Sequence, residues 1–500
     1  MEKCPKCNKP MSNRRTNRNQ GEVDVVAEGQ VRGGARRMVS IRVLALILCV
    51  PSLTTAAPTT FFNVLLPDGA DPWVVRHSDG FYYMTMTTGC NIKLWRSRSL
   101  SGIGGGETKV IWTPPPAGPN SKDLWAPELH HVDGKWYVYF AADDGRTENH
   151  RMFVLENGNP DPFQGEFVER GKVFDPNADK WAIDGTLHNS KGMLFFIWSG
   201  WERDNNVRQN LYIAPMNDPM TISGPRVEIS RPSLPWETIG NPHINEGPEV
   251  VVRNGVVHVV YSASGSWTDD YCLGILSAKL GDNLLSSSSW RKANQPVFSR
   301  GNGVVGPGHA SFTKSPDGKE DWIVYHSARF QGAGWTRRLR TQPFSWQKNG
   351  LPQIGKPLQP NIPIPIPSGD PAHVRFEAEK AKMNGTTRTS QHHTASGGAK
   401  VGYIDTADSF VEFKIRAKRA TTHVVAVRFG NGTKDRQMAS HSVSLNGRAI
   451  GELSYPNSGW DNWSNAFLLV ELKKGSNTVR FSKANGFAEI DCLDVFPKEK

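Results

Sequence analysis

The segment DPWVVRHSDGFYYMTMT, residues 71–87, joins two runs of alternating aromatic and aliphatic residues through a turn at Gly80. This pattern is typical of a β-hairpin. Four further copies follow along the chain: WAPELHHVDGKWYVYFAA at 125–142, DGTLHNSKGMLFFIWSG at 184–200, EGPEVVVRNGVVHVVYSA at 246–263 and HASFTKSPDGKEDWIVYHSA at 309–328. Their turn glycines are Gly80, Gly134, Gly192, Gly255 and Gly318, which lie 54 to 63 residues apart. The sequence therefore predicts five equivalent β units.

A repeat of this length is typical of a β-propeller, in which each four-stranded blade buries its faces only by stacking on its neighbours. Five copies predict a five-bladed propeller, which we place at residues 58–360. The chain after residue 57 has no long segment of 3.6-residue periodicity, so few helices are expected. The fold class predicted for this region is all-β.

Four of the five copies begin their first strand with an ionisable residue, eight or nine positions before the turn glycine: Asp71, Asp184, Glu246 and His309. The innermost strands of a propeller line its central channel, so these side chains are expected to meet at one mouth of it. Gathering like charges is unfavourable and shifts pKa values, which points to a catalytic centre. Any one of these residues alone could instead cap a turn or form a surface ion pair. The shared position of all four argues against that alternative.

Paired carboxylates are the groups that glycoside hydrolysis requires, because one protonates the leaving oxygen while the other activates water or attacks carbon. A third carboxylate nearby can keep the acid protonated at neutral pH. Trp73 and Trp125 lie next to the acidic positions and are candidates for stacking on sugar rings. The alternative for both tryptophans is a place in the propeller core.

The sequence resembles glycoside hydrolase family 43, whose members are five-bladed propellers, over about residues 63–360. The resemblance rests on five motifs: Ala70-Asp71-Pro72-Trp73, Trp125-Ala126-Pro127-Glu128, Ala182-Ile183-Asp184-Gly185, Asn245-Glu246-Gly247-Pro248 and Gly308-His309-Ala310-Ser311. It implies that Asp71 is the general base, Glu246 the general acid, and Asp184 the residue that tunes and positions the acid. Family members invert the anomeric carbon, so the carboxyl groups of Asp71 and Glu246 should be roughly 6.5–9.5 Å apart.

The same resemblance assigns further residues of the site. His309 looks like an axial histidine that supports a bound calcium ion through water, with a hydrogen-bonded imidazole as the alternative. Arg340 resembles an arginine that binds the sugar in the −1 subsite, Arg337 and Arg338 are competitors for that role, and a surface salt bridge is the alternative. Glu128 is offset from the other acids, so a structural role is expected for it.

Residues 361–371, NIPIPIPSGDP, carry proline at alternate positions and are expected to form a stiff linker without a regular ladder of hydrogen bonds. Seven β-like segments follow within residues 372–500, and their spacing predicts a two-sheet jelly-roll sandwich.

This C-terminal region resembles the carbohydrate-binding modules of families 6 and 35. The resemblance rests on Phe376-Glu377-Ala378-Glu379, on the segment from Gly397 to Tyr403, and on Asn485-Gly486-Phe487-Ala488-Glu489-Ile490-Asp491. It implies a structural calcium ion held by Glu377, Glu379 and Asp491, whose oxygen ligands suit Ca²⁺. Tyr403, Trp460 and Asn485 are candidates for the sugar-binding face, with loop packing as the alternative. No organic cofactor is expected.

The formal net charge of +11 is concentrated near the N-terminus, where residues 1–57 contain ten Lys or Arg against four Asp or Glu. The remainder has no basic stripe, so a nucleic-acid partner is not expected. Residues 38–57 read as a secretory signal peptide, with Arg42 before the apolar run 43–50 and small residues at its end. That run is too short to span a bilayer, so no membrane anchor is expected. Residues 1–37 are polar and suggest a spurious or disordered extension before a start at Met38.

Three cysteines follow the predicted signal peptide, and Cys90 with Cys272 is the pairing expected if a disulfide forms. Three N-x-Ser/Thr sequons, at Asn384, Asn431 and Asn462, fit a glycosylated extracellular product.

The sequence thus predicts a secreted, inverting, monomeric α-L-arabinofuranosidase that acts on the arabinan or arabinoxylan of plant cell walls. A β-xylosidase acting on xylo-oligosaccharides has the same catalytic residues and remains an alternative. A non-catalytic glycan-binding propeller and a protein-interaction scaffold are alternatives from other classes.

Overall fold

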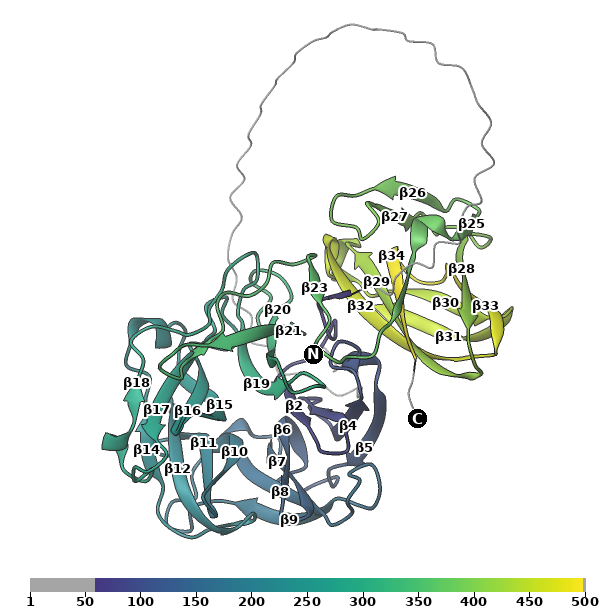
Figure 1. The fold of residues 1–500 in the computed structure, drawn as a ribbon. Helices are drawn as coiled ribbons and strands as arrows, with labels where there is room; N and C mark the ends of the chain where they lie inside the picture. Colours follow the sequence, from purple (N-terminus) through teal and green to yellow (C-terminus); the bar gives the residue numbers. More distant parts are fainter. Residues whose placement is uncertain (1–58, 498–500) are drawn as a thin grey trace, which may run out of the picture. The chain divides into compact units, whose positions relative to one another are not determined.

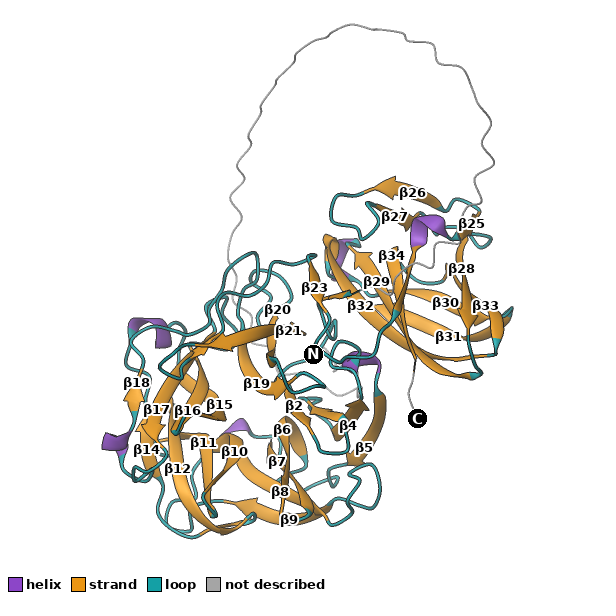
Figure 2. Ribbon diagram, in the orientation of Figure 1, coloured by secondary structure: helices purple, strands orange, loops and turns teal. Residues whose placement is uncertain are grey.

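A computed structural model describes residues 59–497 of the chain, so the predicted extension at 1–37 and the signal peptide at 38–57 lie outside the described residues. Within the described part the regular structure is nearly all β (Figure 2), as expected, and its helical elements are six three-residue 3₁₀ turns. Residues 59–497 contain no helix with the length and hydropathy that a membrane span requires.

The five sequence copies form five antiparallel units, which we number 1 to 5 in chain order (Figure 1). In each unit the strands pair mainly with their neighbours in sequence. Units 3 and 4 share one sheet, because β12 pairs in parallel with β15 at Arg208↔His243 and Gln209↔Ile244. The strands are β2 (Trp73–Arg76), β3 (Tyr82–Thr85), β4 (Ile92–Ser97) and β5 (Glu107–Trp112) in unit 1; β6 (Lys122–Val132), β7 (Lys135–Asp143), β8 (Arg151–Asn157) and β9 (Val168–Val173) in unit 2; β10 (Ala182–Ser190), β11 (Met193–Trp201), β12 (Arg208–Asp218), β13 (Thr221–Ile222) and β14 (Val227–Ser230) in unit 3; β15 (His243–Arg253), β16 (Val256–Ala263), β17 (Cys272–Lys279) and β18 (Arg291–Lys292) in unit 4; and β19 (Gly308–Lys314), β20 (Asp321–Ala328), β21 (Arg337–Trp346) and β22 (Pro352–Gln353) in unit 5.

The predicted hairpins are confirmed. In units 2, 3 and 4 the turn glycine and the residue before it are both left-handed, as at Asn254 (φ 50°) and Gly255 (φ 74°). Two consecutive left-handed residues make the tight turn whose twist matches that of antiparallel strands.

The units pack in a closed series. The first strand of each unit, β2, β6, β10, β15 or β19, contacts the first strand of the next, and β19 contacts β2. Each of five hydrophobic clusters draws buried residues from two adjacent units, including one between unit 5 and unit 1. Each unit therefore buries its faces against its two neighbours.

The predicted linker is partly a strand, which corrects the expectation of a segment without a ladder. β23 (Pro363–Pro365) pairs antiparallel with β1 (Thr60–Phe62), and Ile364 enters the same hydrophobic cluster as Phe61. Proline is tolerated here because the pairing involves only two strands, so an N–H group is not needed on both sides of β23.

The C-terminal residues form two antiparallel sheets that share one hydrophobic core. Alternate residues of β28 are buried, as in a strand with one face toward a core. The first sheet contains β24 (Val374–Glu377), β26 (Arg388–Gln391), β27 (Ala399–Gly402), β29 (Thr421–Asn431), β32 (Gly459–Leu472) and β34 (Glu489–Pro497); the second contains β25 (Lys382–Asn384), β28 (Phe410–Ala417), β30 (Ala439–Leu445), β31 (Arg448–Tyr455) and β33 (Gly475–Lys483).

The expected pairing of Cys90 with Cys272 is wrong, because both are free thiols. Cys90 belongs to unit 1 and Cys272 to β17 of unit 4, and these two units are not neighbours in the series.

One of the sequons is also inaccessible. The side chain of Asn431 is fully buried and donates to the carbonyl oxygens of Gln437 and Tyr455.

Candidate active site

Asp71, Asp184 and His309 come from three different units and meet in one group. Nδ1 of His309 lies 3.3 Å from Oδ1 of Asp71 and 3.8 Å from Oδ2 of Asp184. All three side chains are largely buried. The first strands of units 3 and 5, and the residues just before the first strand of unit 1, thus bring these predicted residues to one place.

Glu246 is connected to this group by contacts of the adjacent residue Gly247. The backbone N–H of Gly247 donates to Oδ2 of Asp184 over 3.0 Å, and the Tyr271 hydroxyl donates to Oε1 of Glu246 over 2.8 Å. The ring of His309 packs directly on Gly247. Asp184 therefore holds the backbone next to Glu246, and the residue after Glu246 lies against His309.

The four ionisable residues do not share one register, which corrects the sequence prediction. One residue near the start of each first strand is left-handed: Asp71 (φ 54°), Ala126 (φ 42°), Asp184 (φ 55°), Gly247 (φ 54°) and His309 (φ 43°). Asp71, Asp184 and His309 occupy this position, but in unit 4 it is Gly247, and Glu246 comes one residue earlier. Counting back from the turn glycines missed this offset because the turns differ in length between units.

Asp71 is arranged to stay ionised. Thr87 donates to its Oδ2 over 2.6 Å, and Nη1 of Arg337 lies 3.4 Å from its Oδ1. Burial alone raises the pKa of Asp71, but His309, His326 and Arg337 outweigh burial and bring that pKa well below its usual range. Burial also lowers the pKa of both histidines, so at pH 7 the lasting positive charge that faces Asp71 is the guanidinium of Arg337.

Glu246 is arranged to hold a proton. Burial raises its pKa to about 7 and the charge of Asp71 adds to this effect, although Tyr271, Arg337 and Ser266 oppose it. Burial, Glu246 and Asp71 together raise the pKa of Asp184 well above its usual range. One ionised and one protonated carboxyl group in the same site are the pair that general base and general acid catalysis requires.

Sequence reasoning missed or misplaced several side chains of this group. His326 accepts a hydrogen bond from the N–H of Asp71 through Nδ1, and its ring stacks on Tyr271 at 5.5 Å. His326 sits in the second strand of its repeat copy and Tyr271 between copies, so neither stood at the position compared across repeats. The only sequence signal was the ionisable character of His326 itself.

The arginine beside Asp71 is Arg337, one of the two competitors, and Arg340 lies elsewhere. Arg340 is 1% exposed, and its Nε donates to Oγ of Ser327. Arg338 is also buried and donates to Oδ1 of Asn462. The structure therefore gives Arg340 a buried structural setting instead of a place at the carboxylates.

Trp73 and Trp125 are both partly buried. The Trp73 indole N–H donates to the carbonyl of Leu129, and its ring packs on His130 at 4.6 Å. Trp125 stacks on His150 at 3.8 Å. Both rings thus have protein partners in unit 2, and each keeps some exposed surface.

The first strands of units 2 and 4, β6 and β15, carry a second acidic pair, Glu128 and Glu249. Nε2 of His130 lies 2.9 Å from Glu128, and the backbone N–H of Phe312 donates to Glu249. Burial raises the pKa of both carboxyl groups well above the usual range, and the charge of Glu249 adds to this effect on Glu128. The charge of Asp184 also raises the pKa of Glu128, and the structural role expected for Glu128 stays a prediction.

In the C-terminal domain, Glu377 and Glu379 gather around Gly397, where an added Cβ would lie 2.2 Å from Oε1 of Glu379. One buried oxygen of each glutamate, Oε2, has no hydrogen-bond partner in the described protein. These oxygens fit a hard cation such as Ca²⁺. The third expected ligand, Asp491, forms an ion pair with Arg428 and accepts from the N–H of Ser396. Within residues 59–497 no group of three or more His, Cys, Asp or Glu side chains is arranged as a metal site.

The expected sugar-face residues have different settings. Tyr403 is 45% exposed and lies beneath the guanidinium of Arg388, while Trp460 is 37% exposed and packs over Gly432. Asn485 donates to Oε1 of Glu452 over 3.3 Å. Tyr403 and Trp460 therefore retain free ring surface.

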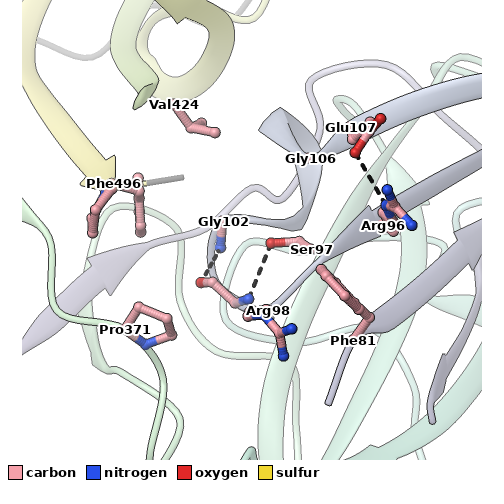
Figure 3. A pocket seen from close by; sticks show the side chains of 12 residues that line it. Phe81, Arg96, Ser97, Arg98, Gly102, Gly106, Glu107, Pro371, Val424 and Phe496 are labelled. Atoms are coloured by element: carbon pink, nitrogen blue, oxygen red, sulfur yellow. Dashed lines mark hydrogen bonds and ion pairs between the residues drawn. The ribbon is translucent and has the colours of Figure 1, made fainter. Parts of the chain in front are cut away.

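A pocket lies apart from all these groups, between unit 1 and the C-terminal sheets (Figure 3). Phe81, Arg96, Arg98, Val424 and Phe496 line it, and Arg96 pairs there with Glu107. None of the catalytic candidates borders this pocket.

Two family profiles and several known proteins match the chain. The sequence profile described as Glycosyl hydrolases family 43 matches residues 63–352, and that of Carbohydrate binding module (family 35) matches residues 374–498. The extracellular exo-alpha-(1->5)-L-arabinofuranosidase of Streptomyces avermitilis is 38% identical over 351 residues, which cover 65% of this chain and 72% of that protein. Alpha-L-arabinofuranosidase 43 of Humicola insolens is 36% identical over 356 residues, covering 69% of this chain and 72% of that protein. The crystal structure of alpha-L-arabinofuranosidase from Lactobacillus brevis matches with a TM-score of 0.57 and 34% identity, over 60% of this chain and 97% of that one.

Proposed function

Because the chain belongs to glycoside hydrolase family 43, we propose that it is an α-L-arabinofuranosidase that releases terminal arabinofuranosyl residues from arabinan or arabinoxylan. The chain is a glycoside hydrolase with a C-terminal carbohydrate-binding module of family 35. The choice of arabinose is supported by the names of its relatives. The single observation that carries the chemistry is geometric: the carboxyl groups of Asp71 and Asp184 meet at His309, and Asp184 holds the backbone beside Glu246.

In the proposed mechanism, Asp71 removes a proton from the attacking water while Glu246 donates a proton to the leaving oxygen. This single displacement inverts the anomeric carbon. Arg337 and Thr87 hold Asp71 in its ionised form, and Asp184 holds the backbone of Gly247 so that Glu246 keeps its direction. The hydroxyls of Tyr271 and Ser266 orient the acid through hydrogen bonds.

The proposed architecture is a five-bladed propeller followed by a jelly-roll sandwich. The closed series of five units with five shared cores supports the propeller, and two antiparallel sheets around one core support the sandwich. The sandwich would hold the enzyme near its polymer through exposed rings such as Tyr403 and Trp460.

Calcium is proposed at two places, and neither takes part in a step of the mechanism. Glu377 and Glu379 offer partner-free buried oxygens in the C-terminal module, whereas the pairing of Asp491 with Arg428 leaves that residue a weaker ligand. His309 faces two carboxylates and is the candidate for an axial ion.

Secretion is proposed as well, because the relatives from two Streptomyces species are named extracellular enzymes. We further propose that the protein acts as a monomer on plant cell-wall polysaccharide.

The proposal is tested by the release of free sugar from an aryl α-L-arabinofuranoside and an aryl β-D-xyloside. We expect turnover of the arabinofuranoside, its loss in Glu246→Gln, and normal activity in the matched control Glu166→Gln, which changes an exposed carboxylate. NMR of the first product formed should show the inverted anomer. Turnover of the xyloside alone would indicate a β-xylosidase, and binding of sugar without turnover would indicate a lectin.

A further inference from the structure

Two tryptophans project from neighbouring loops of units 4 and 5. Trp267 lies in the loop between β16 and β17, and Trp335 in the loop between β20 and β21. Their ring centroids are 5.8 Å apart with the rings at 67°. Trp335 is 65% exposed, and Trp267 is half-buried. Neither ring is part of a hydrophobic core of the described chain.

Hydrogen bonds across the two loops fix the position of this aromatic pair. The Trp335 indole N–H donates to Oγ of Ser266 over 3.2 Å, and the N–H of Gly332 donates to Oδ1 of Asp269 over 2.8 Å. The ring of Trp267 packs on Gly265, where an added Cβ would lie 2.8 Å from it. The exposed rings are therefore held in place before any ligand binds, which lowers the entropy lost on binding.

The aromatic pair adjoins the catalytic acid. Ser266, which accepts from Trp335, also forms a hydrogen bond with Glu246. Arg337 donates to the carbonyl oxygen of Ser266 over 3.0 Å and also faces Asp71. One residue thus separates the Trp335 ring from the group that protonates the leaving oxygen.

We propose that Trp267 and Trp335 bind the sugar residue that departs with the leaving oxygen. This inference rests on the proposed function, because it takes Glu246 as the acid. The leaving oxygen must lie within hydrogen-bonding reach of the acid, so the sugar attached to it lies on the acid's side of the site. Sugar rings stack their C–H faces on aromatic rings, and a rigid exposed indole offers such a surface. The pair therefore favours oligosaccharides and polymers over substrates with small leaving groups.

The test compares kcat/KM for α-1,5-arabinotriose with kcat/KM for methyl α-L-arabinofuranoside, which has no sugar on the leaving side. Trp335→Ala should lower the ratio of the two values about tenfold. Trp335→Phe, which keeps a ring, should retain most of the ratio. Met193→Ala removes another exposed apolar side chain, at the β10–β11 turn, and should leave the ratio unchanged. An unchanged ratio in Trp335→Ala, or an equal loss on both substrates, would overturn the proposal.

A binding measurement separates this proposal from the proposed function. Glu246→Gln and Glu246→Gln/Trp335→Ala are titrated calorimetrically with arabinotriose and with xylotriose. We expect weaker binding of arabinotriose in the double variant. If the double variant binds only xylotriose more weakly than Glu246→Gln does, the arabinose assignment is refuted and the aromatic site is supported. Equal affinities of the two variants for both sugars would overturn the aromatic site.

Discussion

Two carboxylic acids in one buried group differ in protonation because their partners differ. Asp71 faces the guanidinium of Arg337 and accepts from Thr87, and both interactions favour its charged form. Glu246 accepts from neutral hydroxyl groups and lies near the charge of Asp71, so burial decides its state. At Asp71, His309, His326 and Arg337 therefore outweigh burial, whereas at Glu246 burial outweighs Tyr271, Arg337 and Ser266.

Glu246 must be protonated to act as the acid, so kcat/KM should fall as the pH rises through about 7. The Tyr271 hydroxyl stabilises the ionised form of Glu246, and its removal in Tyr271→Phe should raise that pKa. The alkaline limb of the pH profile should then move to higher pH. Tyr82→Phe, which removes a hydroxyl bonded to the carbonyl of Lys314, is the control and should leave the profile unchanged. A shift to lower pH in Tyr271→Phe would contradict the assignment of Glu246 as acid.

The sequence could identify Asp71, Asp184, Glu246 and His309, because they recur near the start of repeated strands. It could not choose Arg337 over Arg340. Strand alternation places Arg338 and Arg340 on one face of β21 and Arg337 on the other, but only the packing of unit 5 against unit 1 decides which face meets Asp71. The sequence did not identify His326 and Tyr271 as site residues for the same reason, because their neighbours come from other strands and loops.

At the scale of the strand, every unit has a left-handed residue in its first strand or, in unit 1, just before it, and in β6, β10, β15 and β19 the pairing register shifts beside it. A left-handed residue other than glycine costs about 1–2 kcal/mol. Asp71, Asp184 and His309 carry this strain at the site itself, as functional residues often do. In unit 4 glycine takes the strained position, which leaves Glu246 in ordinary backbone geometry.

Gly247→Ala tests this arrangement. Its Cβ would lie 3.1 to 3.3 Å from the ring of His309, in addition to the strain of a left-handed alanine. Gly134→Ala is the matched control, because Gly134 is also left-handed but an added Cβ there meets nothing within 4 Å. Both variants should lose about 1 kcal/mol of unfolding free energy. Only Gly247→Ala should lose activity, by about tenfold or more. Equal kcat/KM in the two variants would show that the packing of His309 on Gly247 has no part in catalysis.

The buried pair Glu128 and Glu249 is expected to make the stability of the protein depend on pH. Both have a folded-state pKa above the ordinary value, so the folded protein keeps protons that the unfolded chain releases. Stability is therefore lost as the pH rises above about 4.3, the ordinary pKa of glutamate. Glu249→Gln removes one ionisable group and can still accept from Phe312. Its Tm should exceed that of the unaltered protein by a margin that widens from pH 5 to pH 8.

His130 and Thr186 lie beside Glu128, and the charge of Asp184 also acts on Glu128. The backbone N–H of Phe312 lies beside Glu249. The exposed control Glu166→Gln should show no such widening in thermal melts at the same pH values. A constant Tm difference for Glu249→Gln would mean that Glu249 has the same pKa in the folded and unfolded states.

For the whole molecule, the repeat predicted the number of units but not how the first and last residues of the series are held. The prolines of 361–371 suggested a spacer, yet Ile364 enters the core shared by units 1 and 5. Asp370 accepts from the N–H groups of Leu100 and Ser101 in unit 1. These contacts join residues more than 260 positions apart, so no local pattern could reveal them.

Two truncations test whether this segment belongs to the catalytic domain. A chain ending at residue 372 keeps β23 and Asp370, whereas one ending at residue 359 loses both and leaves the N–H groups of Leu100 and Ser101 without their acceptor. Each buried group left unpaired costs about 1–3 kcal/mol, so the shorter chain should melt about 5 °C or more below the longer one. The longer chain should hydrolyse the aryl arabinofuranoside but bind insoluble polymer more weakly than the full chain, because it lacks the C-terminal module. Equal melting temperatures for the two truncations would show that residues 361–371 act only as a linker. Unchanged polymer binding by the longer truncation would show that the C-terminal module does not bind the polymer.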